Sequence, residues 1–162
     1  MKIRDLMTKH VASVRATDST AVAARMMWDC DCGAIPVLDD DGCVIAMITD
    51  RDICMSALMR DRAPSAIPVS EAMSRDLQFC GPDDNLSTAE QIMRAHQIRR
   101  LPVVDRERRP LGVLSLADIA CATDHHKGRG ARPVGAEEVA VTLAEICTTP
   151  ARDANPSTRA SF

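Results

Sequence analysis

Hydrophobic and polar residues change period several times along the first half of the chain, and each period predicts a different element. Val22, Met26 and Met27 recur at the spacing of an amphipathic helix, directly after the helix-starting cluster Asp18–Thr20. Short apolar runs on either side of an Asp-rich turn have instead the length of strands. The pattern predicts, in order, an extended segment at 11–14, a helix at 19–30, strands at 34–38 and 44–48, and a helix that begins at Thr49.

The second half of the chain repeats this pattern 66 residues later, without a gap. Pro36 is matched by Pro102 and Asp39 by Asp105, and the apolar positions around them stay in phase. A gapless register over this length indicates a duplicated structural unit. The repeat predicts the corresponding elements at 77–80, 85–96, 101–104 and 111–114, followed by a helix that begins at Ser115.

Each copy therefore has the order β-α-β-β-α, which predicts a fold of the α/β (α+β) class. A unit of about 50 residues buries too little of its sheet to be stable alone, so we expect the two copies to pack sheet to sheet. After the second copy, Val139, Leu143 and Ile146 fall on one face of a short amphipathic helix. The expected divisions are repeat 1 at 1–56, a linker at 57–70, repeat 2 at 71–122, and a flexible tail at 123–162 with that helix at 135–147.

Composition narrows the classes of function. The net charge is −3, and one Trp, two Phe and no Tyr leave few rings to stack on bases, so we expect no nucleic-acid binding. No apolar run approaches the roughly 18 residues of a membrane span, which favours a cytoplasmic protein. The seven Cys form no secreted-type framework and are expected to be thiols. Cys30, Cys32 and Cys121, even with the nearby His125 and His126, do not form a four-ligand pattern, so we expect no metal site.

A hydroxyl residue stands three positions before an Asp at the start of the last helix in each copy: Thr49 before Asp52, and Ser115 before Asp118. A helix N-terminus attracts phosphate, the hydroxyl can donate to the same phosphate, and an ionised Asp can accept from both hydroxyls of a ribose. The same spacing is also a capping box, which needs no ligand. One copy alone favours the cap, whereas two copies in phase favour a nucleotide site.

These motifs resemble those of the tandem CBS domain pair, also called the Bateman module. The resemblance covers about residues 1–122, and it is closest to the small stand-alone bacterial CBS proteins of the hypoxic-response type. It implies two repeats related by a pseudo-twofold axis. The residues that carry it are Asp5–Thr8, Gly33–Val37 and Thr49–Ile53 in the first copy, and Ile98–Val103 and Gly112–Ile119 in the second.

The resemblance further implies two adenosine sites, each built from both repeats. Ala46 stands where the family has Gly, so the site of Asp52 is expected to be narrower, while Arg51 would add a charge for phosphate there. In the first site, Ser115 and Asp118 would work with Thr8, Ala12, Cys32, Gly33 and Arg99. In the second, Thr49, Arg51 and Asp52 would work with Ser74, Gln78, Ile98 and Gly33.

The function implied is that of a sensor or regulator in signalling or stress response, with AMP, ADP, ATP or NAD as regulatory ligand, or S-adenosylmethionine. No cofactor is obligatory and no catalytic residue is expected, because no nucleophile with an evident base is present. A homodimer through the CBS repeats and a further, unidentified protein partner are expected. The alternative is a structural or interaction module that binds no nucleotide, with thiol redox or metal sensing as a minor variant.

Overall fold

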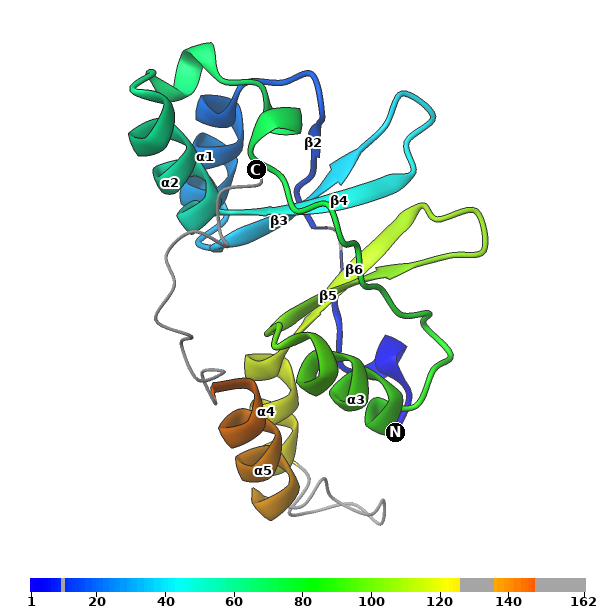
Figure 1. The fold of residues 1–162 in the computed structure, drawn as a ribbon. Helices are drawn as coiled ribbons and strands as arrows, with labels where there is room; N and C mark the ends of the chain where they lie inside the picture. Colours follow the sequence, from blue (N-terminus) through cyan, green and yellow to red (C-terminus); the bar gives the residue numbers. More distant parts are fainter. Residues whose placement is uncertain (10, 126–135, 148–162) are drawn as a thin grey trace.

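The computed structural model describes residues 1–9, 11–125 and 136–147 (Figure 1). Two of its helices, α2 and α4, begin directly at the ends of strands. The elements in chain order are η1 (Ile3–Asp5), β1 (Thr8–Lys9), β2 (Val14–Arg15), α1 (Thr20–Asp29), β3 (Ala34–Leu38), β4 (Val44–Thr49), α2 (Asp50–Arg60), η2 (Pro64–Ala66), η3 (Val69–Glu71), α3 (Leu86–His96), β5 (Arg100–Val104), β6 (Pro110–Ser115), α4 (Leu116–His125) and α5 (Ala136–Cys147).

Two three-stranded sheets occupy the middle of the molecule, one with the order β2-β3-β4 and the other with the order β1-β6-β5. Helices α1 and α2 lie beyond one sheet, and α3, α4 and α5 lie beyond the other (Figure 1). The hairpins β3-β4 and β5-β6 are equivalent, and each has an irregularity one residue before its last pair. The expected α/β architecture of two β-α-β-β-α repeats with pseudo-twofold symmetry is therefore confirmed.

Each repeat is anchored by a segment that precedes the other one in the chain. Ile3 is fully buried in the core that contains β5 and β6, and its N–H donates to the carbonyl of Asp84 (3.2 Å). Val69 is fully buried in the core of the first repeat, and its N–H donates to the carbonyl of Asp18 (2.8 Å). The sequence suggested a division into 1–56, 57–70 and 71–122. The core of each repeat nevertheless includes an apolar residue from outside that repeat, which helps a small unit to bury its sheet.

Gly112 allows β1 to pair with β6. A Cβ on Gly112 would lie 2.4 Å from the carbonyl oxygen of Thr8, a separation that real Cβ atoms do not reach. In the first repeat the same position is Ala46, and there the equivalent segment makes a single backbone hydrogen bond, from Ser74 N to Met47 O (2.9 Å). The methyl group of Ala46 thus accompanies a looser contact between the segment at Ser74 and strand β4.

We expect Gly112→Ala to lower the free energy of unfolding by about 1–3 kcal/mol, because β1 must move away from β6. Urea denaturation followed by circular dichroism measures this. Gly81→Ala is the matched control, because a Cβ there meets its nearest atom at an ordinary 3.5 Å. Equal midpoints for the two variants would contradict the steric role of Gly112.

Candidate ligand-binding site

The last helix of each repeat begins with a complete capping box. In the second repeat, the backbone N–H of Ser115 donates to Asp118 Oδ2 (2.7 Å), Ser115 Oγ donates to the same oxygen (2.6 Å), and the Asp118 N–H donates back to Ser115 Oγ (3.2 Å). Thr49 and Asp52 make the equivalent bonds in the first repeat at 2.9, 2.7 and 3.1 Å. The capping role considered from the sequence is therefore present in both copies.

The cap uses only one carboxylate oxygen of Asp118. The other oxygen, Oδ1, lies 3.4 Å from the hydroxyl of Thr8, near the limit for a hydrogen bond. An ionised carboxylate has lone pairs for further donors at this oxygen. Capping α4 and accepting from a ligand hydroxyl are thus compatible roles for the same side chain.

Thr8, Ser115 and Asp118 face a cavity of about 350 Å³ that residues from both repeats line. Its volume lies within the range of small-molecule pockets. The opposite wall comes from the turn between α1 and β3, where Asp31 has a left-handed backbone with φ of 49°. The full lining is Thr8, Val11, Cys30, Asp31, Cys32, Gly33, Ala34, Arg100, Val113, Ser115 and Asp118.

Five of the seven residues expected around Asp118 line this cavity: Thr8, Cys32, Gly33, Ser115 and Asp118 itself. Two do not. Ala12 packs against the core of the first repeat. Arg99 is exposed and its Nη2 lies 3.9 Å from the sulfur of Cys147 on α5.

Arg100, which the sequence did not single out, supplies the guanidinium of the cavity. It is the first residue of β5 and pairs in register with Ser115. Arg99 lies in the bend just before this strand and its guanidinium lies beside Cys147 of α5, so the two adjacent arginines reach different places. The strand register was the missing signal, since the sequence shows only two adjacent arginines.

The residues expected around Asp52 do not gather in the same way. Ser74 Oγ accepts a hydrogen bond from Met47 N (3.1 Å), and Gln78 Nε2 donates to Asp76 Oδ1 (2.8 Å). Ile98 packs against the core of the second repeat, and Arg51 is exposed. Neither Thr49 nor Asp52 lines the cavity of Asp118 or the larger cavity beside it.

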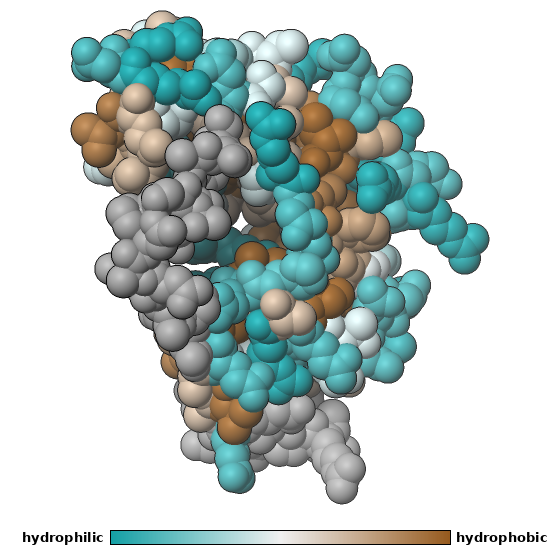
Figure 2. All heavy atoms as spheres, viewed as in Figure 1, coloured by the Kyte–Doolittle hydropathy of each residue, from teal (hydrophilic) through white to brown (hydrophobic). Residues whose placement is uncertain are grey.

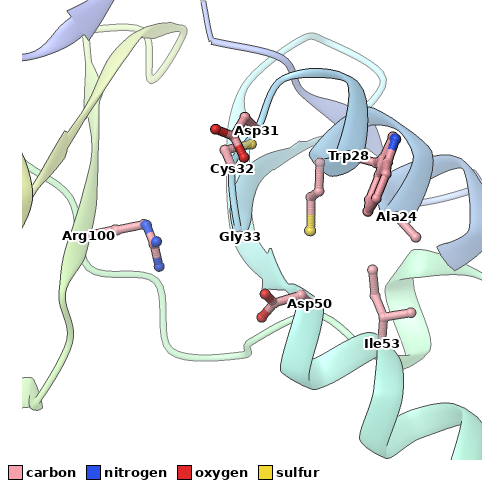
Figure 3. Close-up of a pocket in the computed structure, with 9 residues that line it drawn as sticks. Ala24, Trp28, Asp31, Cys32, Gly33, Asp50, Ile53 and Arg100 are labelled. Carbon is pink, nitrogen blue, oxygen red and sulfur yellow. The ribbon is translucent and has the colours of Figure 1, made fainter.

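That second cavity has a volume of about 480 Å³ and lies between α1, α2 and Arg100. Figure 3 shows Arg100 reaching from the second repeat toward Gly33 and Asp50. The cavity had no sequence signal, because its walls come from segments that meet only in the folded chain. The lining residues are Ala24, Met27, Trp28, Asp31, Cys32, Gly33, Asp50, Ile53 and Arg100.

The thiols of Cys32 and Cys80 are not activated nucleophiles. Burial raises the pKa of the Cys32 thiol, which lines both cavities, and outweighs the backbone hydrogen bond from Ala34. Burial and the nearby Asp84 raise the pKa of Cys80 to about 12. Within 1–9, 11–125 and 136–147, no three His, Cys, Asp or Glu side chains are grouped to hold a metal ion. No helix in these ranges has the length and apolar content that a membrane crossing needs.

A doubled β-α-β-β-α unit, whose halves jointly line a cavity at the starts of equivalent helices, defines a tandem-repeat module of the kind that the sequence resembled. Residues 3–58 and 69–123 each match the CBS domain. The chain belongs to the CBS domain family.

Two similar relatives are bacterial. The chain is 40% identical over 118 residues to the CBS domain-containing protein YhcV of Bacillus subtilis, which covers 73% of this chain and 82% of that protein. It is 31% identical over 123 residues to Hypoxic response protein 1 of Mycobacterium tuberculosis, which covers 76% of this chain and 85% of that protein. The resemblance to the hypoxic-response type is confirmed.

Solved structures show the same fold. A crystal structure of Hypoxic Response Protein I with two coordinated zinc ions superposes with a TM-score of 0.69 at 30% identity, over 75% of this chain and 98% of that one. The CBS domain pair of protein MJ0100, in complex with 5′-methylthioadenosine and S-adenosyl-L-methionine, superposes with a TM-score of 0.70 at 24% identity. This second match covers 78% of this chain and 98% of that one.

We expect the two classes of thiol to react differently with iodoacetamide. The thiolate is the reactive form, so a pKa of about 12 keeps Cys80 protonated and unreactive at pH 8, while Cys54 is exposed and accessible. Peptide mass spectrometry should find Cys54 labelled and Cys80 unlabelled until urea unfolds the chain. Equal labelling of the two cysteines in the folded protein would contradict the burial of Cys80.

Proposed function

We propose that this protein is a regulatory module that binds an adenosine-containing ligand in the cavity of Asp118. The observation that supports this most directly is the meeting of Thr8 from the N-terminal segment with Ser115 and Asp118 from the second repeat, opposite Cys32 and Gly33 of the first. In this proposal the ligand is AMP, ADP, ATP, NAD or S-adenosylmethionine. The protein acts in the cytoplasm, in signalling or a stress response, and is not an enzyme.

The chemistry of the cavity suits the parts of such a ligand. Asp118 Oδ1 is the acceptor for the ribose hydroxyls, because Oδ2 is occupied by the cap of α4. The start of α4 and the guanidinium of Arg100 favour an anionic group such as phosphate. Val11, Ala34 and Val113 offer apolar contacts for the base. The ligands named in the MJ0100 complex are both adenosine derivatives, which agrees with the adenosine part of this proposal.

A ligand in this position touches both repeats at once. Its binding energy can therefore favour one relative arrangement of the repeats over another, which is the property a sensor needs. The alternative function is a scaffold that binds no nucleotide. The capping boxes alone would serve a scaffold equally well. The sensor is favoured by the cavity, in which Asp118 Oδ1 accepts only a long contact from the hydroxyl of Thr8.

We expect isothermal titration calorimetry with AMP, ADP, ATP, NAD⁺ and S-adenosylmethionine to detect binding of at least one ligand. Asp118→Asn should weaken it at least about tenfold, because a charged acceptor is lost. Asp52→Asn is the matched control: it alters the same capping box in α2, outside the cavity. Thermal unfolding of both variants checks that they fold.

If the folded wild-type protein bound none of these ligands, the sensor function would be refuted and the scaffold function would remain. Loss of binding in Asp52→Asn instead of Asp118→Asn would move the working site to the first repeat. Either result changes the proposal in a defined way.

We also propose that two copies of the chain associate through the helical face of the first repeat. On α2, Met55, Leu58 and Met59 are 41%, 71% and 65% exposed, and hydrophobic residues lie at the surface over α1 and α2, at the upper left of Figure 2. The equivalent helix α4 is instead covered by α5, whose Ile146 is 6% exposed. The face of α2 thus leaves apolar side chains exposed to solvent, and a second copy of the chain would cover it.

We expect analytical ultracentrifugation to show a dimer of the 17.6 kDa chain at micromolar concentration. Leu58→Asp should shift it to monomer, because a charge would be buried at the interface. Ala63→Asp, exposed just beyond α2, is the control that adds the same charge outside this face. A monomeric wild-type protein, or a dimer that survives Leu58→Asp, would refute this interface.

A further inference from the structure

The cavity of Asp118 and the larger cavity beside it are neighbours that share one wall. Asp31, Cys32, Gly33 and Arg100 line both of them. Gly33 lies at the centre of this wall: a Cβ there would lie 3.0 Å from Asp50 Oδ2 and 3.7 Å from Arg100 Nη2. Because Gly33 has no side chain, the guanidinium of Arg100 and the carboxylate of Asp50 both lie close to this shared wall.

Arg100 stands at this junction between the two cavities. In the part of the chain that the structure describes, its guanidinium makes no hydrogen bond or ion pair, and it is exposed. Its planar fork of donors suits two neighbouring anionic oxygens, as in a phosphate or pyrophosphate. An anionic group bound here would sit between the two cavities.

The lining of the larger cavity also contains an aromatic side chain and acidic side chains. Trp28, the one tryptophan in the sequence, lines it while 84% of its surface is exposed. Asp31 and Asp50 bring two carboxylates to the same cavity. Asp50 Oδ1 accepts from the N–H of Arg51 (2.7 Å), which leaves Oδ2 beside Gly33. An indole face with two carboxylates favours a planar cation.

We propose that the two cavities form one elongated site for a dinucleotide whose second ring is cationic, namely NAD⁺. This inference rests on the proposed function, because the adenosine occupies the cavity of Asp118. The pyrophosphate then lies at Arg100, and the positively charged nicotinamide ring lies against Trp28 beside Asp31 and Asp50. The site thus distinguishes NAD⁺ from NADH, whose ring is neutral, and from mononucleotides, which fill only the first cavity.

The test compares four ligands by calorimetry: AMP, ADP-ribose, NAD⁺ and NADH. ADP-ribose is the matched ligand, because it carries the adenosine and pyrophosphate without the nicotinamide. We expect NAD⁺ to bind roughly tenfold more tightly than ADP-ribose or NADH, the size of one partly desolvated cation–π contact. The fluorescence of Trp28 should be quenched by NAD⁺ and unchanged by AMP.

Two variants assign the gain to the second cavity. Trp28→Leu and Asp50→Asn should reduce the affinity for NAD⁺ to that for ADP-ribose, while the affinity for AMP stays unchanged, because neither residue lines the cavity of Asp118. An Asn side chain can still accept the hydrogen bond that Asp50 Oδ1 accepts from the N–H of Arg51, so that substitution is compatible with the fold. Asp29→Asn is the matched control, because it removes an exposed carboxylate that lines neither cavity.

Equal affinities for NAD⁺ and ADP-ribose in the wild-type protein, with AMP still bound, would overturn the dinucleotide site and leave the proposed function intact. A gain that depends on Trp28 and Asp50 for S-adenosylmethionine, and not for NAD⁺, would also overturn it. If none of the ligands binds to the folded protein, the proposed function fails and this inference fails with it.

Discussion

The burial of two small sheets, each anchored by a segment from outside its own repeat, is the constraint on which the rest of this structure depends. A unit of about 50 residues with three short strands cannot exclude water from its sheet by itself. Ile3 and Val69 stand at equivalent positions of the two copies. Ile3 is fully buried in the core of the second repeat, and Val69 is fully buried in the core of the first. The crossing segments tie the repeats together, so neither can be treated as an independent domain.

The candidate site follows from this arrangement. The segment that carries Ile3 continues into Thr8, which therefore arrives beside β6 and the start of α4. The turn after α1 closes the cavity from the first repeat. Ser115 and Asp118 stabilise the helix start whether or not a ligand is present, because the cap needs only one carboxylate oxygen. Capping of α4 uses Asp118 Oδ2, and the proposed ligand contact uses Asp118 Oδ1, so the two roles do not compete for one atom.

The two repeats differ from exact pseudo-twofold symmetry in the pairing of their sheets and in the covering of their helices. Gly112 lets β1 close against the second sheet, whereas Ala46 stands at that position in the first repeat. Helix α5 covers the second pair of helices, with Arg94 paired to Glu145 (3.3 Å). At the position equivalent to Arg94, the first repeat has Trp28, which is 84% exposed. The duplicated fold thus carries two different surfaces and two different helix-start environments.

The sequence by itself determined the helices, the two hairpins, their order and the duplication, because periodicity and capping are local properties that a 66-residue repeat displays twice. Strand β1 at Thr8–Lys9 was not predicted, and the segment predicted at 77–80 makes only one isolated bridge, from Cys80 to Val103. It also identified Thr8, Cys32, Gly33, Ser115 and Asp118, which the fold gathers at one cavity. Only the tertiary structure decided that Arg100 faces this cavity while Arg99 lies beside α5, since strand register is set by long-range pairing. The exchange of anchoring segments and the second cavity with Trp28 and Asp50 likewise depend on contacts between segments distant in sequence, which no local pattern encodes.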